Sequence, residues 1–446
     1  MNIKVITTNE GKNHYLQQVE SVSFIHQTDA AMEAVNIYPE ITYQTISGFG
    51  GAFTEAMAYN VLGLPEAKQD ALIADYFGEQ GIGYNLCRTH INSCDFALGN
   101  YAYVEDETDT AFATFDISRD KKYIIPVIKK AQVVTKEPIA FLASPWSPPA
   151  FMKTTGEMNH GGKLKPECQK AWAQYIAKYI KTYKEEGIEI SMITVQNEPE
   201  AVQTWDSCVY TSEEEMIFVR DYLGPIFEEE GLEDVKIFVW DHNKERLYER
   251  TRDILKDEKA NRYVSGIGFH WYTGDHFEAV QMVRDIYPDK ELLFTEGCVE
   301  YSRFAQANAV QKANMYAHDM IGNFNSGMNG YIDWNMVLDH KGGPNHVGNF
   351  CDAPIMCNEE QTDYEKRLTY YYIGHFSKYI KKGAKRIATT KYTADLDVVG
   401  FVNPDDEKVI VVLNRTSEAK HITLREEQRY AKVTVEPQAI YTFIYQ

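Results

Sequence analysis

The chain has 446 residues and a formal net charge of −20, with 44% hydrophobic, 25% charged and 13% aromatic residues. This composition is typical of a globular protein, and the length suits one catalytic barrel with an accessory domain. Because the chain is strongly negative, it repels phosphate backbones and anionic headgroups. We therefore exclude nucleic acid as a partner.

The first twelve residues, MNIKVITTNEGK, contain neither an apolar core nor a small-residue cleavage site. No stretch approaches the roughly 18 uninterrupted apolar residues of a membrane helix. We therefore expect a cytoplasmic protein without membrane insertion, or a secreted one if a signal peptide was removed. The seven cysteines are scattered, which favours reduced thiols, although Cys351 and Cys357 are close enough in sequence to pair. The oligomeric state stays open.

Strand-like and helical patterns alternate through most of the chain. The first 45 residues have the pattern of short strands, and residues 46–385 alternate β-type runs with amphipathic helices, which predicts a parallel sheet. The expected strands are Ser47–Phe53, Tyr84–Ile91, Ile139–Ser144, Ser191–Val195, Lys236–Asp241, Ser265–His270, Leu292–Thr295 and Gly330–Asn335. The expected helices include Pro65–Gln80, Lys165–Glu186, Ser212–Glu229, Arg303–Asn323 and Tyr364–Lys382. Eight strands favour an α/β fold of the (β/α)₈ TIM-barrel type over a doubly wound open sheet.

The tail beyond Ala388 has strand patterns without helices. They fall at Asp397–Val402, Val409–Asn414, Ala419–Leu424, Ala431–Val435 and Ile440–Tyr445. This spacing predicts an antiparallel β-sandwich, with which the N-terminal strands are expected to pair. The predicted domains are therefore an accessory sandwich of residues 1–45 and 386–446, and a catalytic barrel of residues 46–385.

Two glutamates follow predicted strands and form the central site hypothesis. Glu198 follows the fourth strand and Glu296 the seventh, each after an apolar run that would bring it to the barrel rim. Cleavage of a sugar acetal needs one carboxyl group to protonate the leaving oxygen and one to face the anomeric carbon. A lone glutamate after a strand is usually a helix cap or ion-pair partner. Two of them, with tryptophan and asparagine nearby, favour catalysis.

Six motifs, in chain order, resemble glycoside hydrolase family 30 in its glucosylceramidase-like branch. They are Gly48-Phe49-Gly50-Gly51-Ala52-Phe53-Thr54-Glu55-Ala56, Ser144-Pro145-Trp146-Ser147-Pro148-Pro149, Thr194-Val195-Gln196-Asn197-Glu198-Pro199, Phe269-His270-Trp271-Tyr272, Thr295-Glu296-Gly297-Cys298, and Trp334-Asn335 followed by Gly342-Gly343-Pro344-Asn345. The resemblance covers nearly the whole chain, including the two-ended sandwich. It implies a retaining double displacement, with Glu198 as acid/base and Glu296 as nucleophile.

The same resemblance implies a set of sugar-binding residues. Asn197 matches the residue that bonds the sugar 2-hydroxyl, and Tyr272 matches a tyrosine near the nucleophile. Aromatic surfaces of the first subsite are implied for Trp146 and Trp334. The remaining candidates are Glu55, His270, Arg88 and Asn335. Arg88 would keep the nucleophile ionised, although a purely structural ion pair is almost as well founded.

Two positions depart from the family pattern. Glu55 stands where glucosylceramidases carry Asp, so contacts to remote sugar hydroxyls are expected to shift. His346 replaces a tryptophan of the mammalian enzymes, which bears on the leaving-group side.

Other chemistries are less well supported by the sequence. Gly48-Phe49-Gly50-Gly51 lacks the third glycine of a dinucleotide loop, and no G-x-S-x-G nucleophile elbow is present. His90, His242, His270 and His340 suit hydrogen bonding in a sugar cleft better than a metal site. We expect no metal and no cofactor.

The sequence therefore predicts a retaining β-glycosidase that acts on a carbohydrate, with β-glucosides favoured. An endo-β-1,6-glucanase or a β-xylosidase with the same catalytic pair remains open. From another class, a non-catalytic carbohydrate-binding protein is the alternative, although a binder has no need of both carboxylates.

Overall fold

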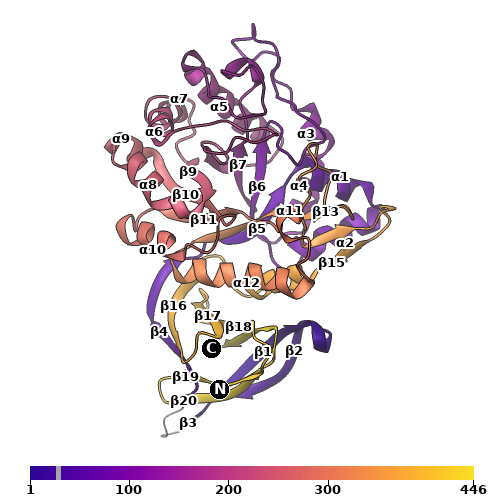
Figure 1. Ribbon diagram of the computed structural model, residues 1–446, viewed down its shortest axis with the longest axis vertical. Helices are drawn as coiled ribbons and strands as arrows, with labels where there is room; N and C mark the ends of the chain where they lie inside the picture. Colours follow the sequence, from indigo (N-terminus) through magenta and orange to yellow (C-terminus); the bar gives the residue numbers. More distant parts are fainter. Residues whose placement is uncertain (27–31) are drawn as a thin grey trace.

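The computed structural model describes residues 1–26 and 32–446, which form a barrel and a β-sandwich below it (Figure 1). In the described ranges, eight parallel strands close into a barrel in chain order, with the last strand beside the first. The strands are β5 (Gly48–Phe53), β6 (Leu86–Ile91), β7 (Ala140–Pro145), β8 (Ile190–Thr194), β9 (Lys236–Asn243), β10 (Val264–His270), β11 (Glu291–Glu296) and β12 (Gly330–Asn335). The predicted TIM barrel is confirmed.

Helices surround the barrel and cover the outer faces of its strands (Figure 1). They are α1 (Glu55–Gly63), α2 (Glu66–Phe77), α3 (Ser118–Lys122), α4 (Ile124–Val134), α5 (Gln169–Glu185), α6 (Ser212–Ile217), α7 (Gly224–Glu229), α8 (Leu247–Leu255), α9 (Glu258–Tyr263), α10 (Phe277–Ile286), α11 (Tyr301–Phe304), α12 (Ala309–Asn325) and α13 (Leu368–Ser377). A π-helical segment, Phe218–Leu223, joins α6 to α7. Strands covered on both sides are apolar throughout, which explains their near-continuous hydrophobic sequences.

The interior of the barrel is a packed core. Side chains from six strands fill it, namely Leu86, Leu142, Met192, Phe238, Leu293 and Ile332. β5 approaches β6 so closely that a Cβ at Gly50 would lie 1.7 Å from the carbonyl oxygen of Leu86. Only glycine fits at this position, so the glycine-rich start of the barrel serves strand packing. The filled interior leaves the strand ends as the place for a site.

The sandwich combines both ends of the chain. In the described residues its strands are ordered β2-β1-β21-β18-β17-β16-β4-β19-β20-β3. Their bounds are β1 (Asn2–Asn9), β2 (His14–Ser23), β3 (Ile25–His26), β4 (Ala34–Thr45), β16 (Lys385–Lys391), β17 (Leu396–Val402), β18 (Lys408–Asn414), β19 (Lys420–Glu426), β20 (Arg429–Val435) and β21 (Ala439–Tyr445). β1 pairs with β21 and β4 with β16, so the predicted pairing of N-terminal strands with the tail is confirmed.

Two predicted helices differ from the structure. The stretch 303–323 is split into α11 and α12, because Asn308 caps a new helix through a reciprocal bond pair with Gln311. The stretch 364–382 begins as a strand, β15 (Tyr364–Lys366), which pairs with β14 (Ile355–Cys357) beside β13 (Val337–Leu338). Among the described residues, no helix is long and apolar enough to cross a bilayer.

Candidate active site

Reactive side chains gather where the barrel strands end at their carboxyl termini. Glu198 lies four residues beyond the end of β8, Glu296 is the last residue of β11, and Arg88 is on β6 between them. Each of these strands is buried over most of its length, so the charged groups appear only at its end. The pattern matches the rule that parallel barrels carry their chemistry at this face.

Two donors hold the carboxylate of Glu296. Arg88 donates from Nη1 to its Oε2 at 2.7 Å, and the hydroxyl of Tyr272 donates to its Oε1 at 2.8 Å. Burial raises the pKa of Glu296, while His270 and Arg88 act in the opposite direction. A donor on each oxygen fixes the carboxylate plane and favours the ionised form that a nucleophile requires.

Glu198 is paired with a histidine that is held between two carboxylates. Nδ1 of His270 lies 3.1 Å from Oε1 of Glu198, and Nε2 lies 3.0 Å from Oδ1 of Asp241. Since each ring nitrogen faces a carboxylate oxygen, both act as donors and the ring is an imidazolium. Burial opposes this charge, but Glu296 and Asp241 raise the pKa of His270 to about 9. A proton is therefore held beside Glu198 at neutral pH.

The pKa of Glu198 responds to the same neighbours. Burial alone would raise it, but His242 and His270 lower it, so the carboxyl group yields its proton to the imidazole in the resting state. Nε2 of His242 lies 3.8 Å from Oε1 of Glu198. The Glu198–His270 pair thus holds a proton in a hydrogen bond beside the cavity.

Asp241 connects the two halves of the site. Its Oδ2 accepts from Nη2 of Arg88 at 2.8 Å, and its Oδ1 accepts from His270. The hydroxyls of two further residues also donate to it, namely Thr194 and Thr295. Although burial works against ionisation, Arg88 and His270 lower the pKa of Asp241. One ionised carboxylate therefore orients both the guanidinium beside Glu296 and the imidazolium beside Glu198.

The backbone is left-handed where β8 and β9 end. The φ angles are 48° at Glu198, 72° at Trp240 and 51° at Asp241, and the N–H of Glu198 donates to the carbonyl of Asp241 at 3.0 Å. Such angles cost on the order of 1 kcal/mol or more each for residues with a side chain, and they persist where surrounding contacts fix them. At these positions the chain brings the carboxylates of Glu198 and Asp241 to the same side chain, His270.

A cavity of about 150 Å³ opens between the two glutamates. It is lined by Asp95, Trp146, Asn197, Glu198, Gln203, Trp205, His242, Asn243, Tyr272, Glu296, Cys298, Glu300, Arg303, Trp334, Asn349 and Cys351. Trp146 and Trp334 stack with centroids 5.1 Å apart, and the guanidinium of Arg88 lies 4.7 Å from the Trp146 ring. Aromatic faces beside carboxylates and amides are suited to binding a sugar ring.

Comparison with known families agrees with this geometry. The model described as the glycosyl hydrolase family 30 TIM-barrel domain matches residues 46–380, and the family's β-sandwich domain matches residues 383–443. The chain belongs to glycosyl hydrolase family 30. It is thus a glycoside hydrolase of the glucosylceramidase-like branch, as its motifs predicted.

Three relatives of this family 30 chain span nearly its full length. SrfJ from Salmonella typhimurium has a solved structure that superposes with a TM-score of 0.97 at 39% identity, and the match covers 100% of both chains. The lysosomal acid glucosylceramidase of Mus musculus is 32% identical over 428 residues, which cover 92% of this chain and 83% of the mouse protein. The endo-β1,6-glucanase BT3312 superposes with a TM-score of 0.89 at 29% identity, over 99% of each chain.

Most of the predicted site residues lie together in this family 30 barrel. The cavity lining includes Glu198, Glu296, Asn197, Trp146, Trp334 and Tyr272. Arg88 and His270 lie behind the lining, where they contact the glutamates, and Arg88 also donates to Oδ1 of Asn197 at 2.8 Å. Both are fully buried, so they act on the carboxylates rather than at the cavity surface.

Two of the predicted sugar contacts lie outside the cavity lining. The carboxylate of Glu55 accepts from Nε and Nη2 of Arg119 at 2.6 and 2.9 Å, and from the N–H of Leu98. Asn335 accepts from the hydroxyl of Thr54 at 2.6 Å and is also buried. A direct sugar contact by either residue stays a prediction that this arrangement does not favour.

The cavity also contains an acid that was not predicted. Asp95 follows β6 and accepts from Nδ2 of Asn345 at 3.2 Å and of Asn349 at 3.3 Å. Burial and the charge of Glu296 raise its pKa to about 8, so it is a protonated donor at neutral pH. Its position just beyond a barrel strand is the signal that could have identified it, as it identified the two glutamates.

The cysteine neighbours differ from the pair that was left open. Sγ of Cys351 lies 3.2 Å from Sγ of Cys298, and Cys357 takes no part in this contact. Within the described residues all seven cysteines are free thiols. Cys298 and Cys351 both line the catalytic cavity, so their thiols form part of its apolar surface.

Glu198, His270 and Glu296 are close enough to chelate a cation. Each offers one ligand atom, and these atoms lie within 4.8 Å of one another. Both nitrogens of His270 already face carboxylate oxygens, so an imidazolium has no lone pair to give to a metal. The arrangement is better suited to proton transfer than to metal binding.

Proposed function

We propose that this chain is a retaining β-glycosidase with Glu296 as nucleophile and Glu198 as acid/base. The observation that carries the proposal is the separation of the two carboxylates, which have ligand oxygens within 4.8 Å of each other. Retaining enzymes place these groups about 5–5.5 Å apart, whereas inverting enzymes leave about 6.5–9.5 Å for a water molecule. The short separation supports direct attack by a carboxylate.

The contacts of the two glutamates support a separate catalytic role for each. An oxygen of Glu296 attacks the anomeric carbon, while Glu198 passes a proton taken from His270 to the leaving oxygen, so that Glu198 ends this step ionised and His270 neutral. The C–O bond to the leaving group breaks as the ester to Glu296 forms. In the second step, Glu198 removes a proton from water and returns it to His270, while the water oxygen bonds to the anomeric carbon and the ester bond to Glu296 breaks. Asn197 supplies an amide beside the nucleophile for the neighbouring sugar hydroxyl.

Single β-linked glucose units are the proposed substrate of the first subsite. The cavity of about 150 Å³ lies below the roughly 300–1,000 Å³ of pockets that enclose drug-sized ligands, so it suits one ring. Asp95 and Asn349 line the same cavity as the Trp146–Trp334 pair and offer hydrogen bonds to sugar hydroxyls. A glucosylceramidase among the relatives is consistent with a β-glucoside preference.

An endo-β-1,6-glucanase is the second candidate. It is favoured by the 29% identity and 0.89 TM-score to a protein of that name, and by 27% identity to an endo-1,6-β-D-glucanase of Neurospora crassa. Such an enzyme needs a cleft that is open on both sides of the cleaved bond. Release of glucose from chain ends, or of longer fragments from within β-1,6-glucan, separates the two candidates.

A panel of p-nitrophenyl β-glycosides tests the proposal. Glucoside, xyloside, fucoside, galactoside and glucuronide are offered to the wild type and to Glu296→Gln. Release of nitrophenol from one glycoside, lost in the variant, supports the proposal and identifies the sugar. Equal release by both proteins would exclude Glu296 as nucleophile. If no nitrophenol were released from any of these glycosides but β-1,6-glucan were cleaved, the second candidate would be favoured. Tight sugar binding without any cleavage would favour a non-catalytic binding protein.

A further inference from the structure

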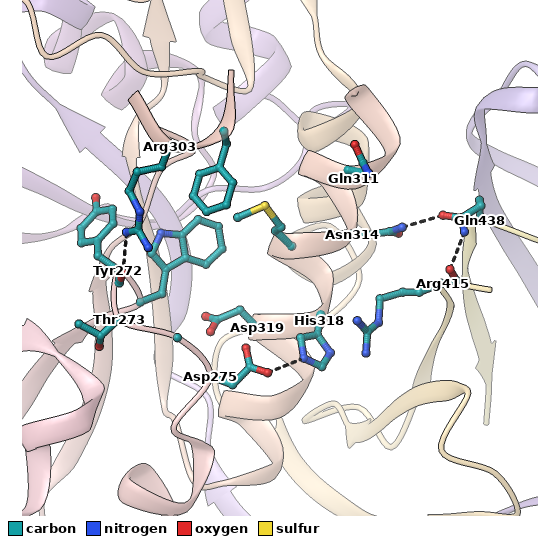
Figure 2. Close-up of a pocket in the computed structure, with 14 residues that line it drawn as sticks. Tyr272, Thr273, Asp275, Arg303, Gln311, Asn314, His318, Asp319, Arg415 and Gln438 are labelled. Carbon is teal, nitrogen blue, oxygen red and sulfur yellow. Dashed lines mark hydrogen bonds and ion pairs between the residues drawn. The ribbon is translucent and has the colours of Figure 1, made fainter. Parts of the chain in front are cut away.

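A second, larger cavity lies beside the catalytic one, at the junction of barrel and sandwich (Figure 2). Its volume is about 490 Å³. One wall is the loop after β10, from Trp271 to Asp275, and another is a face of α12 with residues three or four positions apart. The turn after β18 and the turn before β21 close it from the sandwich side, through Arg415 and Gln438.

The two cavities share a partition. Tyr272 and Arg303 line both of them, and Nη1 of Arg303 donates to the carbonyl oxygen of Tyr272 at 2.6 Å (Figure 2). The hydroxyl of Tyr272 contacts the nucleophile Glu296. A ligand that extends from the catalytic cavity past Arg303 therefore enters the second cavity.

The extension lies on the side where a leaving group would exit. The proposed glucose ring is bounded on one side by Asp95 and Trp146, which follow or end β6 and β7. Tyr272 and Arg303 come from the opposite part, after β10 and β11. The aglycone must leave away from the enclosed ring, so its path leads toward this partition.

The walls of the second cavity combine apolar faces with planar polar groups. Trp271, Phe304 and Met315 supply the apolar surface. The indole nitrogen of Trp271 is already used, because it donates to the carbonyl of Cys298 at 3.2 Å. An aromatic face near amides is the combination on which a sugar ring stacks while its hydroxyls bond the rim.

Polar groups at the rim have capacity left for a ligand. Nδ2 of Asn314 donates to Oε1 of Gln438 at 2.8 Å, but the buried Oδ1 of Asn314 has no partner among the residues that the structure describes. Arg415 uses Nε toward Asp397 at 2.9 Å, which leaves its terminal nitrogens without a hydrogen-bond partner in the described chain. A free acceptor beside free donors suits hydroxyl groups, which are both donors and acceptors.

The charges around the cavity favour a neutral ligand. His318 is paired with Asp275 at 3.0 Å and with Asp397 at 2.8 Å, and Arg415 shares Asp397. The cations are thus already neutralised, and the chain as a whole carries a charge of −20. An anionic ligand would be repelled, whereas a neutral polyhydroxyl compound would not.

We propose that this second cavity binds a sugar unit on the leaving-group side of a β-linked gluco-oligosaccharide. The proposal rests on the proposed function and extends it to the substrate class, because a built second sugar site implies a short soluble glucan rather than a single glucose on an arbitrary aglycone. Phe304 provides the stacking face, and Asn314 and Arg415 the hydroxyl contacts.

The test compares chain-length dependence in Phe304→Ala and wild type, with Tyr392→Ala as the control. Phe304 lies outside the catalytic cavity, and Tyr392 is an exposed aromatic side chain of the sandwich that lines neither cavity. The substrates are p-nitrophenyl β-glucoside and β-1,6- and β-1,4-linked glucose oligomers of two to four units. We expect kcat/KM to fall by about three- to tenfold for the glucose oligomers but not for the aryl glucoside, the usual effect of one lost stacking face.

The outcomes separate the inference from the proposed function. If Phe304→Ala cleaves trimers and tetramers as well as wild type, the inference is wrong while the aryl activity still stands. If the wild type cleaves no β-glycoside, the proposed function fails, and calorimetric titration of Glu296→Gln with the tetramer then tests the cavity by itself. Weaker binding in Glu296→Gln/Phe304→Ala than in Glu296→Gln supports the site, and equal binding overturns it. Met315→Ala repeats the test if Phe304→Ala does not fold.

Discussion

Nδ1 of His270 lies 3.1 Å from Oε1 of Glu198, while Nε2 of the same ring lies 3.0 Å from Asp241. Asp241 stays ionised because Arg88 and His270 lower its pKa. The imidazolium can therefore transfer its proton only to Glu198. In the proposed mechanism the acid/base is therefore the Glu198–His270 pair rather than one side chain, and this affects the pH dependence of activity.

Replacing His270 should narrow the pH range of activity. The pKa of His270 is raised to about 9, and the pKa of Glu296 is raised by burial, so we expect a bell-shaped profile of kcat/KM. In His270→Gln the amide cannot store a proton, so the alkaline limb should move to lower pH, with a loss on the order of 10²-fold in kcat. A pH series with an aryl glycoside measures this, and an alkaline limb that does not move would contradict the assigned role.

Removing Arg88 should affect both stability and catalysis. Its guanidinium lies between Glu296 and Asp241, at 2.7 and 2.8 Å, and all three groups are nearly inaccessible to water. In Arg88→Met the two carboxylates lose their common cation, which costs about 3–5 kcal/mol when a buried pair is broken. Thermal unfolding and kcat/KM should both fall. Arg119→Met, at the partly exposed partner of Glu55, is the control and should leave kcat almost unchanged.

Asp95→Asn should make the protein less sensitive to rising pH. The native pKa of Asp95 is about 8, well above its unfolded value near 3.8, so folding retains a proton that the unfolded chain releases. Its contribution to stability is complete below pH 4 and declines as pH rises toward 8. We expect the variant to exceed wild type in stability at pH 8, by on the order of 5 kcal/mol, and to match it at pH 4. Urea unfolding of both proteins at pH 4 and pH 8 measures this. If both proteins lost the same free energy of unfolding between pH 4 and pH 8, the raised pKa of Asp95 would be contradicted.

The thiols should resist alkylation in the folded protein. Burial raises the pKa of Cys87 and Cys357 to about 12 and that of Cys208 to about 11, so few thiolates form at neutral pH. Iodoacetamide should modify Cys168 first, because it is only partly buried, and the others only in denaturant. Mass spectrometry of digested protein measures the order. Rapid labelling of Cys298 or Cys351 would show that the catalytic cavity opens more than this structure indicates.

The barrel was predictable because its signals are local. Each strand is a short buried run, and Gly330–Asn335 was expected with the bounds that the structure has. Predicted element boundaries were wrong where pairing with another segment sets the secondary structure. Tyr364–Lys366, for example, pairs as a strand with Ile355–Cys357 instead of starting the predicted helix. The split before α12 depends on a local cap at Asn308, which the sequence shows but which was read as part of one helix.

The positions of Glu198 and Glu296 at one cavity were predictable from the sequence, whereas the contacts that hold them were less so. Glu198 and Glu296 each follow an apolar run, which marks a strand end. Asp241 also ends a strand, but its role depends on Arg88 and His270, which are separated from it in sequence and meet it only in the closed barrel. Glu55 was expected at the sugar because of its motif, which stays a prediction, and its ion pair with Arg119 has no local signal in the sequence.

The anomeric configuration of azide adducts tests the two glutamate assignments most directly. Glu296→Ala and Glu198→Ala are given azide and a dinitrophenyl β-glycoside of the sugar found with the aryl panel, and the glycosyl azides are examined by NMR. The account predicts the α-azide from Glu296→Ala, because azide attacks from the space of the missing nucleophile. It predicts the β-azide from Glu198→Ala, because azide then attacks the ester on Glu296 from the other face. The reverse pair of products would contradict the assignment.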